Sequence, residues 1–289
     1  MPPLIWDHQP ENLRKPAMVC AFEGWNDAGD SASNAVGLFM RTLKARRFAH
    51  YDPQEFFDFQ ANRPLIRHTT EGSRGLTWPT VEIFEGHAPR AARDLVLVRG
   101  VEPSMRWRSF CSHLIDLAEA LGVEMIITLG ALLGDVAHSR PVSMTGYASD
   151  LPLIESLGVK ASTYEGPTGI LGALHVCCLE AEMPSASLWA GVPHYVAAAS
   201  NPKAALALVR KVELLVNVSV NASELEEAAE DYERQVAAAV QCDPEISAFV
   251  ERLEQEADSD PQLATRQVPS GDVLEREFQR FLKQRGPRP

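Results

Sequence analysis

The sequence has few cysteines and no long apolar run, and both shortages narrow the class of protein. Its five cysteines form no Cys-x-x-Cys pair, so neither a disulfide framework nor a zinc site of that type is expected. Cys177 and Cys178 are adjacent in an apolar stretch, and we expect all five thiols to be reduced and buried. The longest apolar run, near residues 125–133, is about half of the ~18–20 residues that cross a membrane.

Several functional signatures are also missing. The first sixteen residues lack the basic segment and apolar core of a signal peptide, so we predict a cytoplasmic protein. The sequence contains no HExxH, EF-hand, P-loop or GxGxxG pattern, and we therefore expect neither a metal nor a cofactor. Its net charge of −12 repels phosphate backbones and anionic membrane surfaces, which argues against nucleic-acid and membrane partners.

The apolar pattern predicts a sheet covered by helices. Hydrophobic residues make up 45% of the chain and charged residues 23%, which is typical of a globular protein. Buried strands are predicted at 17–22, 94–99, 123–129 and 185–192, shorter β-like runs at 48–51, 64–68 and 80–84, and helices at 26–44, 107–121, 151–158 and 168–181. Strands too apolar to face water, alternating with helices, indicate an α/β fold with a mostly parallel sheet and helices on both faces.

The character of the chain changes after residue 202. Helices are predicted at 203–217, 223–240, 244–257 and 272–284, with a loop at 258–271 and a disordered end. Ser223 is expected to begin a capping box, and Asp243 to cap a helix that has Pro244 in its first turn. We therefore divide the chain into an α/β domain, residues 1–202, and an acidic helical subdomain, residues 203–289.

Unusual polar and aromatic residues gather in four loops near predicted strand ends. In an open parallel sheet the carboxyl ends of the strands meet at one edge, where ligands bind. We therefore expect these loops to form a candidate ligand-binding cleft. Its residues are Glu23, Trp25, Asn26, Asp27, Asp135, His138, Arg140, Glu165, Thr168, His194 and Tyr195.

Each loop also has a purely structural interpretation. Asp135 can orient His138 as a general base, or the two can form an internal network with Arg140 that fixes the loop. Ser139 lacks the GxSxG context of a nucleophile, so no catalytic residue is assigned. An Asn or Asp side chain near residue 26 and Thr168 can simply cap the helices that follow them.

Four segments together carry a resemblance to a known family. They are Glu23–Gly29, Gly134–Pro141, Tyr164–Gly169, and Trp189–Tyr195 followed by Asn201–Ala204. They resemble the bacterial and archaeal proteasome assembly chaperones, in the branch named after the second chaperone. The resemblance covers roughly residues 15–215, and the helical tail is similar to that of the actinobacterial type.

The resemblance has consequences for fold and partners. It implies a three-layer α/β/α fold akin to nucleoside phosphorylases and a homo-oligomer, suspected to be a trimer. It also implies a chaperone role in assembly of the proteasome core, with core subunits as partners.

Two functions remain open at this point. The first is a non-catalytic interaction or assembly protein, which is favoured because the residues offer no complete catalytic constellation. The alternative is a small-molecule-binding protein, or a hydrolase- or ligase-type enzyme, that uses the strand-end cleft for a nucleoside- or amide-like ligand.

Overall fold

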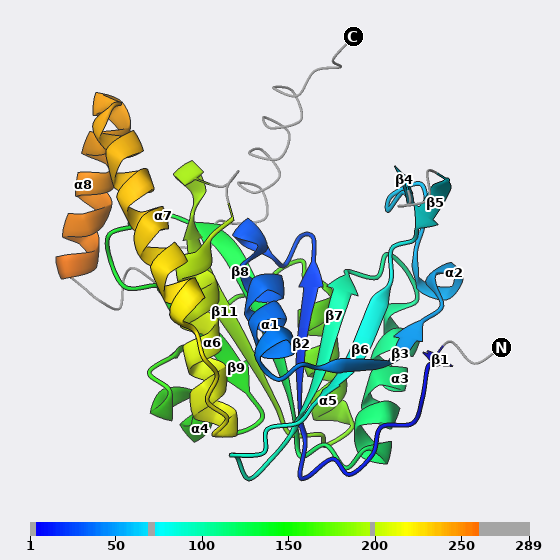
Figure 1. Ribbon diagram of the computed structural model, residues 1–289. Coiled ribbons are helices and arrows are strands. Elements are labelled where there is room, and N and C mark those ends of the chain that lie inside the picture. Colours follow the sequence, from blue (N-terminus) through cyan, green and yellow to red (C-terminus); the bar gives the residue numbers. More distant parts are fainter. Residues whose placement is uncertain (1–3, 69–72, 197–199, 260–289) are drawn as a thin grey trace.

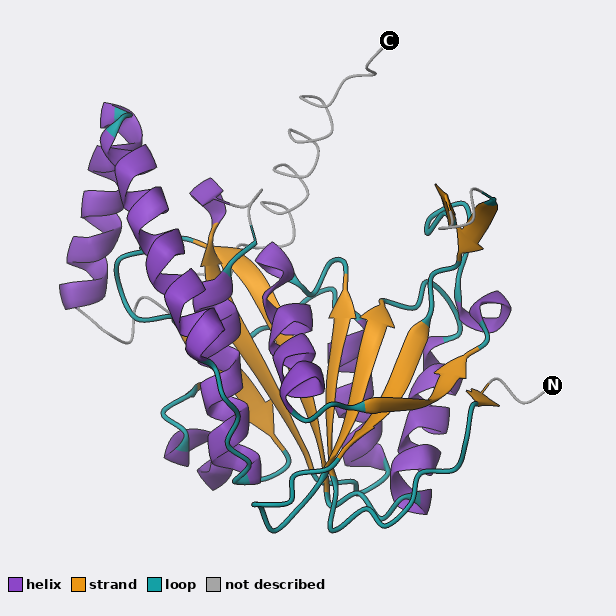
Figure 2. Cartoon of the chain, in the orientation of Figure 1, coloured by secondary structure: helices purple, strands orange, loops and turns teal. Residues whose placement is uncertain are grey.

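The computed structural model describes residues 4–68, 73–196 and 200–259. A nine-stranded sheet has the order β1-β3-β6-β7-β2-β8-β11-β9-β10. Its centre consists of four parallel strands: β7 (Leu95–Val101), β2 (Ala17–Glu23), β8 (Met125–Gly134) and β11 (Ser185–Pro193). Helices cover both faces (Figures 1 and 2), so the predicted three-layer α/β/α architecture is confirmed.

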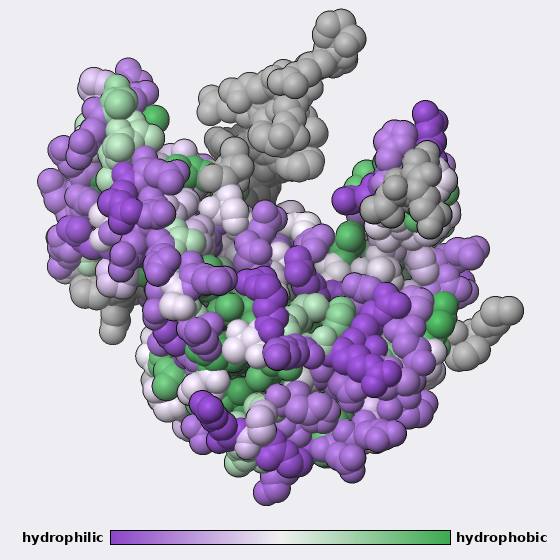
Figure 3. Space-filling model, viewed as in Figure 1, coloured by the Kyte–Doolittle hydropathy of each residue, from purple (hydrophilic) through white to green (hydrophobic). Residues whose placement is uncertain are grey.

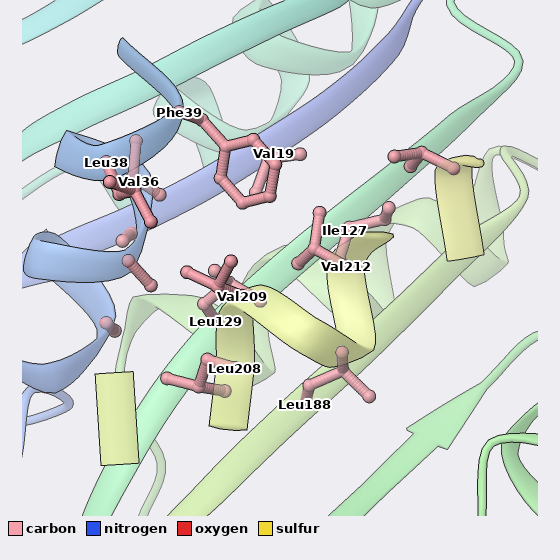
Figure 4. Packing of buried hydrophobic residues seen from close by; sticks show 14 of the residues in the cluster. Val19, Val36, Leu38, Phe39, Ile127, Leu129, Leu188, Leu208, Val209 and Val212 are labelled. Carbon is pink, nitrogen blue, oxygen red and sulfur yellow. The ribbon is translucent and has the colours of Figure 1, made fainter. Parts of the chain in front are cut away.

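Alternating side chains of the central strands form two separate cores. On one face, Val19 of β2 packs beneath α1 (Ser31–Thr42) and α6 (Pro202–Val216), together with Phe39 and Val212 (Figure 4). On the other face, Met18 and Phe22 pack beneath α3 (Trp107–Ala120) and α5 (Ile170–Glu180). This alternation explains why the central strands are apolar at nearly every position.

The outer strands were less visible in the sequence. β6 (Val81–Gly86), β3 (Arg46–Tyr51) and β1 (Leu4–Trp6) extend the sheet antiparallel at one side, and β9 (Met144–Ala148) and β10 (Lys160–Ala161) extend it at the other. β1, β9, β10 and the short α2 (Pro53–Phe56) were not predicted, because two to five residues are too few to establish a period. Near β9 and β10 lies α4 (Leu151–Ser156), which is shorter than expected.

A small hairpin stands apart from the main sheet. β4 (Leu65–His68) was expected as a strand, but it pairs only with β5 (Arg74–Thr77), in a second sheet of two strands. The hairpin projects from the same edge of the main sheet as α7 (Ser223–Gln241) and α8 (Pro244–Ser259), at the opposite end (Figure 1).

The helices after residue 202 belong to two packing environments. α6 lies in the same core as α1, whereas α7 (Ser223–Gln241) and α8 (Pro244–Ser259) form a smaller cluster with Tyr195. The division into two domains at residue 202 stays a prediction. The loop expected at 258–271 begins inside α8, and its remainder, the helix at 272–284 and the chain end lie outside the described residues.

The two caps predicted after residue 202 had different outcomes. Asp243 Oδ1 accepts from the backbone N–H groups of Glu245 and Ile246, at 2.9 and 3.3 Å, as expected. The capping box at Ser223 was wrong: the helix is preceded by Ala222, without a side-chain cap. The Ser223 N–H instead donates to the side chain of Asn221.

The cysteines follow the expectation from the sequence only in part. All five cysteines are free, and Cys20, Cys111 and Cys178 are buried. The expectation that every cysteine is buried was wrong, because Cys177 is only partly buried and Cys242 is exposed after the end of α7. Within the described ranges, no helix has the length and apolar character needed to span a bilayer.

Candidate functional site

Parallel strands bring several predicted site residues to one edge of the sheet. β2 ends at Glu23, β8 at Gly134 and β11 at Pro193, so the loops after them start at this carboxyl edge. The loop before α5 also arrives there, since Gly169 lies directly against Asn26. β7 adds Glu102, which the sequence analysis missed although it follows a predicted strand in the same way.

Glu102 links two other segments at the centre of this edge by hydrogen bonds. Its Oε1 accepts from Asn26 Nδ2 at 2.6 Å and from the Ile170 backbone N–H at 2.8 Å. The second bond caps the amino terminus of α5, where a carboxylate is favoured by the exposed N–H groups and the helix dipole. Asn26 is fully buried, and its Oδ1 has no hydrogen-bond partner among the described residues.

Asp27 is a helix cap rather than a free carboxylate. Its Oδ1 accepts from the Ala32 N–H at 2.6 Å, and both carboxylate oxygens lie 3.3 Å from the Ser33 nitrogen. Burial raises the pKa of Asp27, and the hydrogen bonds from Ser33 and Ala32 oppose that shift. The expected N-cap position was wrong, because α1 begins later, at Ser31, after a short 3-10 turn at Ala28–Asp30. Asp27 nevertheless accepts from two N–H groups in the first turn of α1.

Other predicted residues at this edge face solvent. Trp25 is 49% exposed, and Glu23 is paired with Arg99 at 3.3 Å. Glu165 and Thr168 are exposed in the loop before α5. The expected Thr168 cap was wrong, because α5 is preceded by Gly169, and Glu102 accepts the Ile170 N–H instead.

The remaining predicted residues form a second group near the end of β11. The Asp135 carboxylate lies 3.0 Å from His194 Nδ1 and so orients that ring rather than His138. The Tyr195 hydroxyl accepts from the His138 backbone N–H at 2.8 Å and lies 2.9 Å from His138 Nδ1. The expected Asp135–His138 pair is thus replaced by two separate pairs.

This second group is tied to the C-terminal helices. Lys203 of α6 donates to the His138 carbonyl oxygen at 2.5 Å and pairs with Glu233 of α7 at 2.7 Å. Arg140 pairs with Asp258 of α8, with Nη2–Oδ2 and Nε–Oδ1 distances of 2.6 and 2.9 Å. The loop is thus fixed by its polar groups, but the expected internal network of Asp135, His138 and Arg140 was wrong. Each of the three bonds to a residue outside the loop instead.

The space around His138 is small. Residues from β11, the loop after β8, α6 and α7 line a recess of about 10 Å³, which is no more than one water molecule requires. Burial and the nearby Lys203 ammonium lower the pKa of His138, so the ring is held neutral. A neutral ring can accept a hydrogen bond from the Tyr195 hydroxyl at Nδ1.

Across residues 4–68, 73–196 and 200–259, no three His, Cys, Asp or Glu side chains are arranged to hold a metal ion. The polar groups at the centre of the carboxyl edge are hydrogen-bond acceptors, Asn26 Oδ1 and the Glu102 carboxylate.

The chain is thus a three-layer α/β/α protein. The polar groups of its strand-end loops bond to the N-terminal turns of α1 and α5 and to the C-terminal helices. The sequence profile of the PAC2 family matches residues 21–240, and the chain belongs to the PAC2 family. Among curated proteins, none matches the chain significantly.

Solved structures agree with this assignment. The chain is 47% identical to a PAC2 family protein from Streptomyces avermitilis, with a TM-score of 0.75, covering 81% of this chain and 99% of that one. It is 41% identical to a proteasome-assembly chaperone homologue from Mycobacterium tuberculosis, with the same TM-score and coverage. An archaeal proteasome activator from Pyrococcus furiosus, at 18% identity and a TM-score of 0.65, covers 82% of this chain and 97% of its own and shares the fold.

Proposed function

We propose that this protein is a non-catalytic, cytoplasmic assembly protein that acts on proteasome core subunits as a homo-oligomer, with a trimer as the expected state. The observation that carries the proposal is the 41% identity to a proteasome-assembly chaperone homologue, over 99% of that chain. Identity at this level over nearly a whole chain supports a shared role as well as a shared fold.

The local geometry supports the same proposal. A catalytic His–Asp pair needs a base that can reach a substrate. His138 is 5% exposed, contacts Tyr195, and lies beside a recess of water size. Asp135 orients the exposed His194 instead. The polar residues of this loop therefore serve to hold α6, α7 and α8 in place.

Affinity capture tests the proposal directly. The tagged full-length protein is purified from its native cells, and co-purifying proteins are quantified against the tag alone and an unrelated acidic protein of similar size. Enrichment of unprocessed proteasome α or β subunits is the expected result. Recovery of the protein without either subunit, in cells that express both, would refute the chaperone role.

One observation favours a second candidate function, binding of a small molecule at the carboxyl edge. Asn26 Oδ1 is buried without a partner, and Glu102 Oε1 already accepts two bonds beside it. A ligand that reached these groups would have to donate hydrogen bonds, as an amine or an amide does.

A thermal-shift screen with nucleosides, nucleotides and simple amides tests this second function. A concentration-dependent rise in Tm that is lost in Asn26→Ala and kept in Glu119→Ala, at an exposed position on α3, would support it. The absence of a shift with all three classes would leave Asn26 as a structural residue.

A further inference from the structure

The β4–β5 hairpin exposes more apolar surface than an isolated pair of strands tolerates. Ile66 and Leu76 face each other across the hairpin and are 65% and 56% exposed, while Leu65 is 54% exposed on the opposite side. Trp78, at the base, contacts Phe59 with the two rings tilted by 57°, and it remains 44% exposed. A two-stranded sheet is marginal in water by itself, and clustered apolar surface of this kind marks an interaction site.

The hairpin is also basic, although the chain as a whole is acidic. Residues 63–78 carry three arginines and one glutamate, in a chain of net charge −12. Arg63, Arg67 and Arg74 are exposed and form no ion pair with any residue that the structure describes. The hairpin therefore suits a partner surface that is negatively charged.

This chain has such a surface on α7. The helix carries six acidic residues and a single arginine. Glu224, Glu227 and Glu230 are exposed at spacings of three residues, so they lie on the same side of the helix. In the described part of the chain these three carboxylates also have no ion-pair partner.

The hairpin and α7 lie too far apart to contact each other within one molecule. The hairpin stands at one end of the carboxyl edge, beyond β3, and the α7–α8 pair stands at the other end, beyond β11 (Figure 1). In the space-filling view they form two separate projections with hydrophilic surface on both (Figure 3). A contact between opposite ends of neighbouring molecules is head-to-tail, and it closes into a ring when the rotation allows.

We propose that the β4–β5 hairpin of one molecule docks on the acidic outer face of α7 of a second copy. The inference names the surface for the homo-oligomer of the proposed function and requires no proteasome subunit. The arginines give the contact its orientation, and Leu65, Ile66 and Leu76 supply the apolar area that becomes buried.

The test measures the mass of the purified full-length protein by light scattering during gel filtration. The wild type is expected to form a defined oligomer that weakens in high salt, because screening reduces the charge term. Arg67→Glu/Arg74→Glu and Glu227→Lys/Glu230→Lys should each raise the dissociation constant at least tenfold. Arg90→Glu, exposed on the loop at the opposite edge, should associate as the wild type does.

Mixing the two double variants is the decisive step. Association to at least a 1:1 complex should return in the mixture, because the acidic hairpin of one variant then faces the basic helix of the other. A closed trimer is not expected there, because in a ring of three two molecules of the same variant would have to meet. Circular dichroism and Tm must show that each variant is folded. A monomeric wild type, an oligomer that survives both reversals, or one sensitive only to the hairpin reversal would overturn the proposal. Affinity capture of proteasome subunits by the same variants tests the chaperone role independently of self-association.

Discussion

Glu102 Oε1 accepts a hydrogen bond from Asn26 Nδ2 at 2.6 Å, and this contact joins the ends of β7 and β2. The same oxygen also caps α5 through Ile170. One carboxylate thus links two parallel strands to the helix that leads into β11. Bonds to an ionised acceptor are stronger than those between neutral groups, so Glu102 is expected to stabilise the whole edge.

Replacing Glu102 tests that role. Glu102→Ala removes the partner of a buried amide and the cap of α5, and the free energy of unfolding should fall by about 2–4 kcal/mol. Glu102→Gln keeps an acceptor oxygen and should cost about 1 kcal/mol. Urea unfolding measures both, with the exposed Glu165→Ala as the control, expected within about 0.5 kcal/mol of wild type. Equal stability of all three variants would exclude a structural role for Glu102.

Glu102 also shows where sequence reasoning stopped. The apolar strands placed the carboxyl edge correctly, because buried runs such as Ala17–Glu23 have few alternatives. The rule that strand ends carry the site applied to Glu102 as well, but its segment, residues 100–106, contains a single glycine and no aromatic residue. Composition therefore pointed to distinctive loops, whereas the geometry gave the central position to an inconspicuous residue.

The side-chain partners of Asp135 and His138 could not be predicted from the sequence, for a different reason. Asp135 and His138 are three residues apart, and helical spacing would bring them together. After β8 the backbone forms turns instead, and each group finds a partner more than fifty residues away, His194 and Tyr195 respectively. Such partners depend on the order of the strands, which a single sequence does not reveal.

Gly130 provides a packing test in the centre of the sheet. It lies beside Trp189 of β11, and a Cβ at this position would come within 2.5 Å of the indole ring. Gly130→Ala should therefore lower the free energy of unfolding by about 1–3 kcal/mol or more through overpacking. Gly191→Ala, whose Cβ would meet only ordinary contacts at 3.4–3.5 Å, is the control, with a change below about 1 kcal/mol. Equal effects in chemical denaturation would contradict this account.

Asp94 predicts an acid-dependent loss of stability. The carboxylate is buried, which alone would raise its pKa, but bonds from Arg14 and from the Ala88 N–H lower that pKa to about 2. A folded-state pKa below the unfolded value of about 3.9 means stability that is present above pH 4 and disappears as pH falls toward 2. The shift corresponds to roughly 2.5 kcal/mol.

Asp94→Asn should remove this pH-dependent contribution to the free energy of unfolding. At pH 7 the variant should be less stable by at least that amount, since Arg14 loses its charged partner, and its stability should change less between pH 4 and 2. Urea midpoints across that pH range provide the measurement. Asp116→Asn, at an exposed position on α3, should follow the wild-type profile. Parallel profiles for wild type and Asp94→Asn would mean that Asp94 is not the group responsible.

We expect His138 to couple the docking of α7 and α8 to pH. Its ring contacts Tyr195 and is faced by Lys203, Glu233 and Glu254. Burial and Lys203 lower the pKa of His138 below the unfolded value of about 6.5, so the folded state favours the neutral ring. The resulting stability is present above pH 6.5 and decreases as pH falls through the lower, folded-state pKa.

Amide hydrogen exchange can locate this effect. Protection of α7 and α8, corrected for intrinsic rates, should be greater at pH 7 than at pH 5, while protection of β2 and β8 changes less. In His138→Gln the difference should shrink, because no group at that position titrates. His87→Gln, on an exposed loop at the other edge, should keep the full difference. If α7 and α8 are protected equally at both pH values in the wild type, protonation of His138 does not loosen these helices.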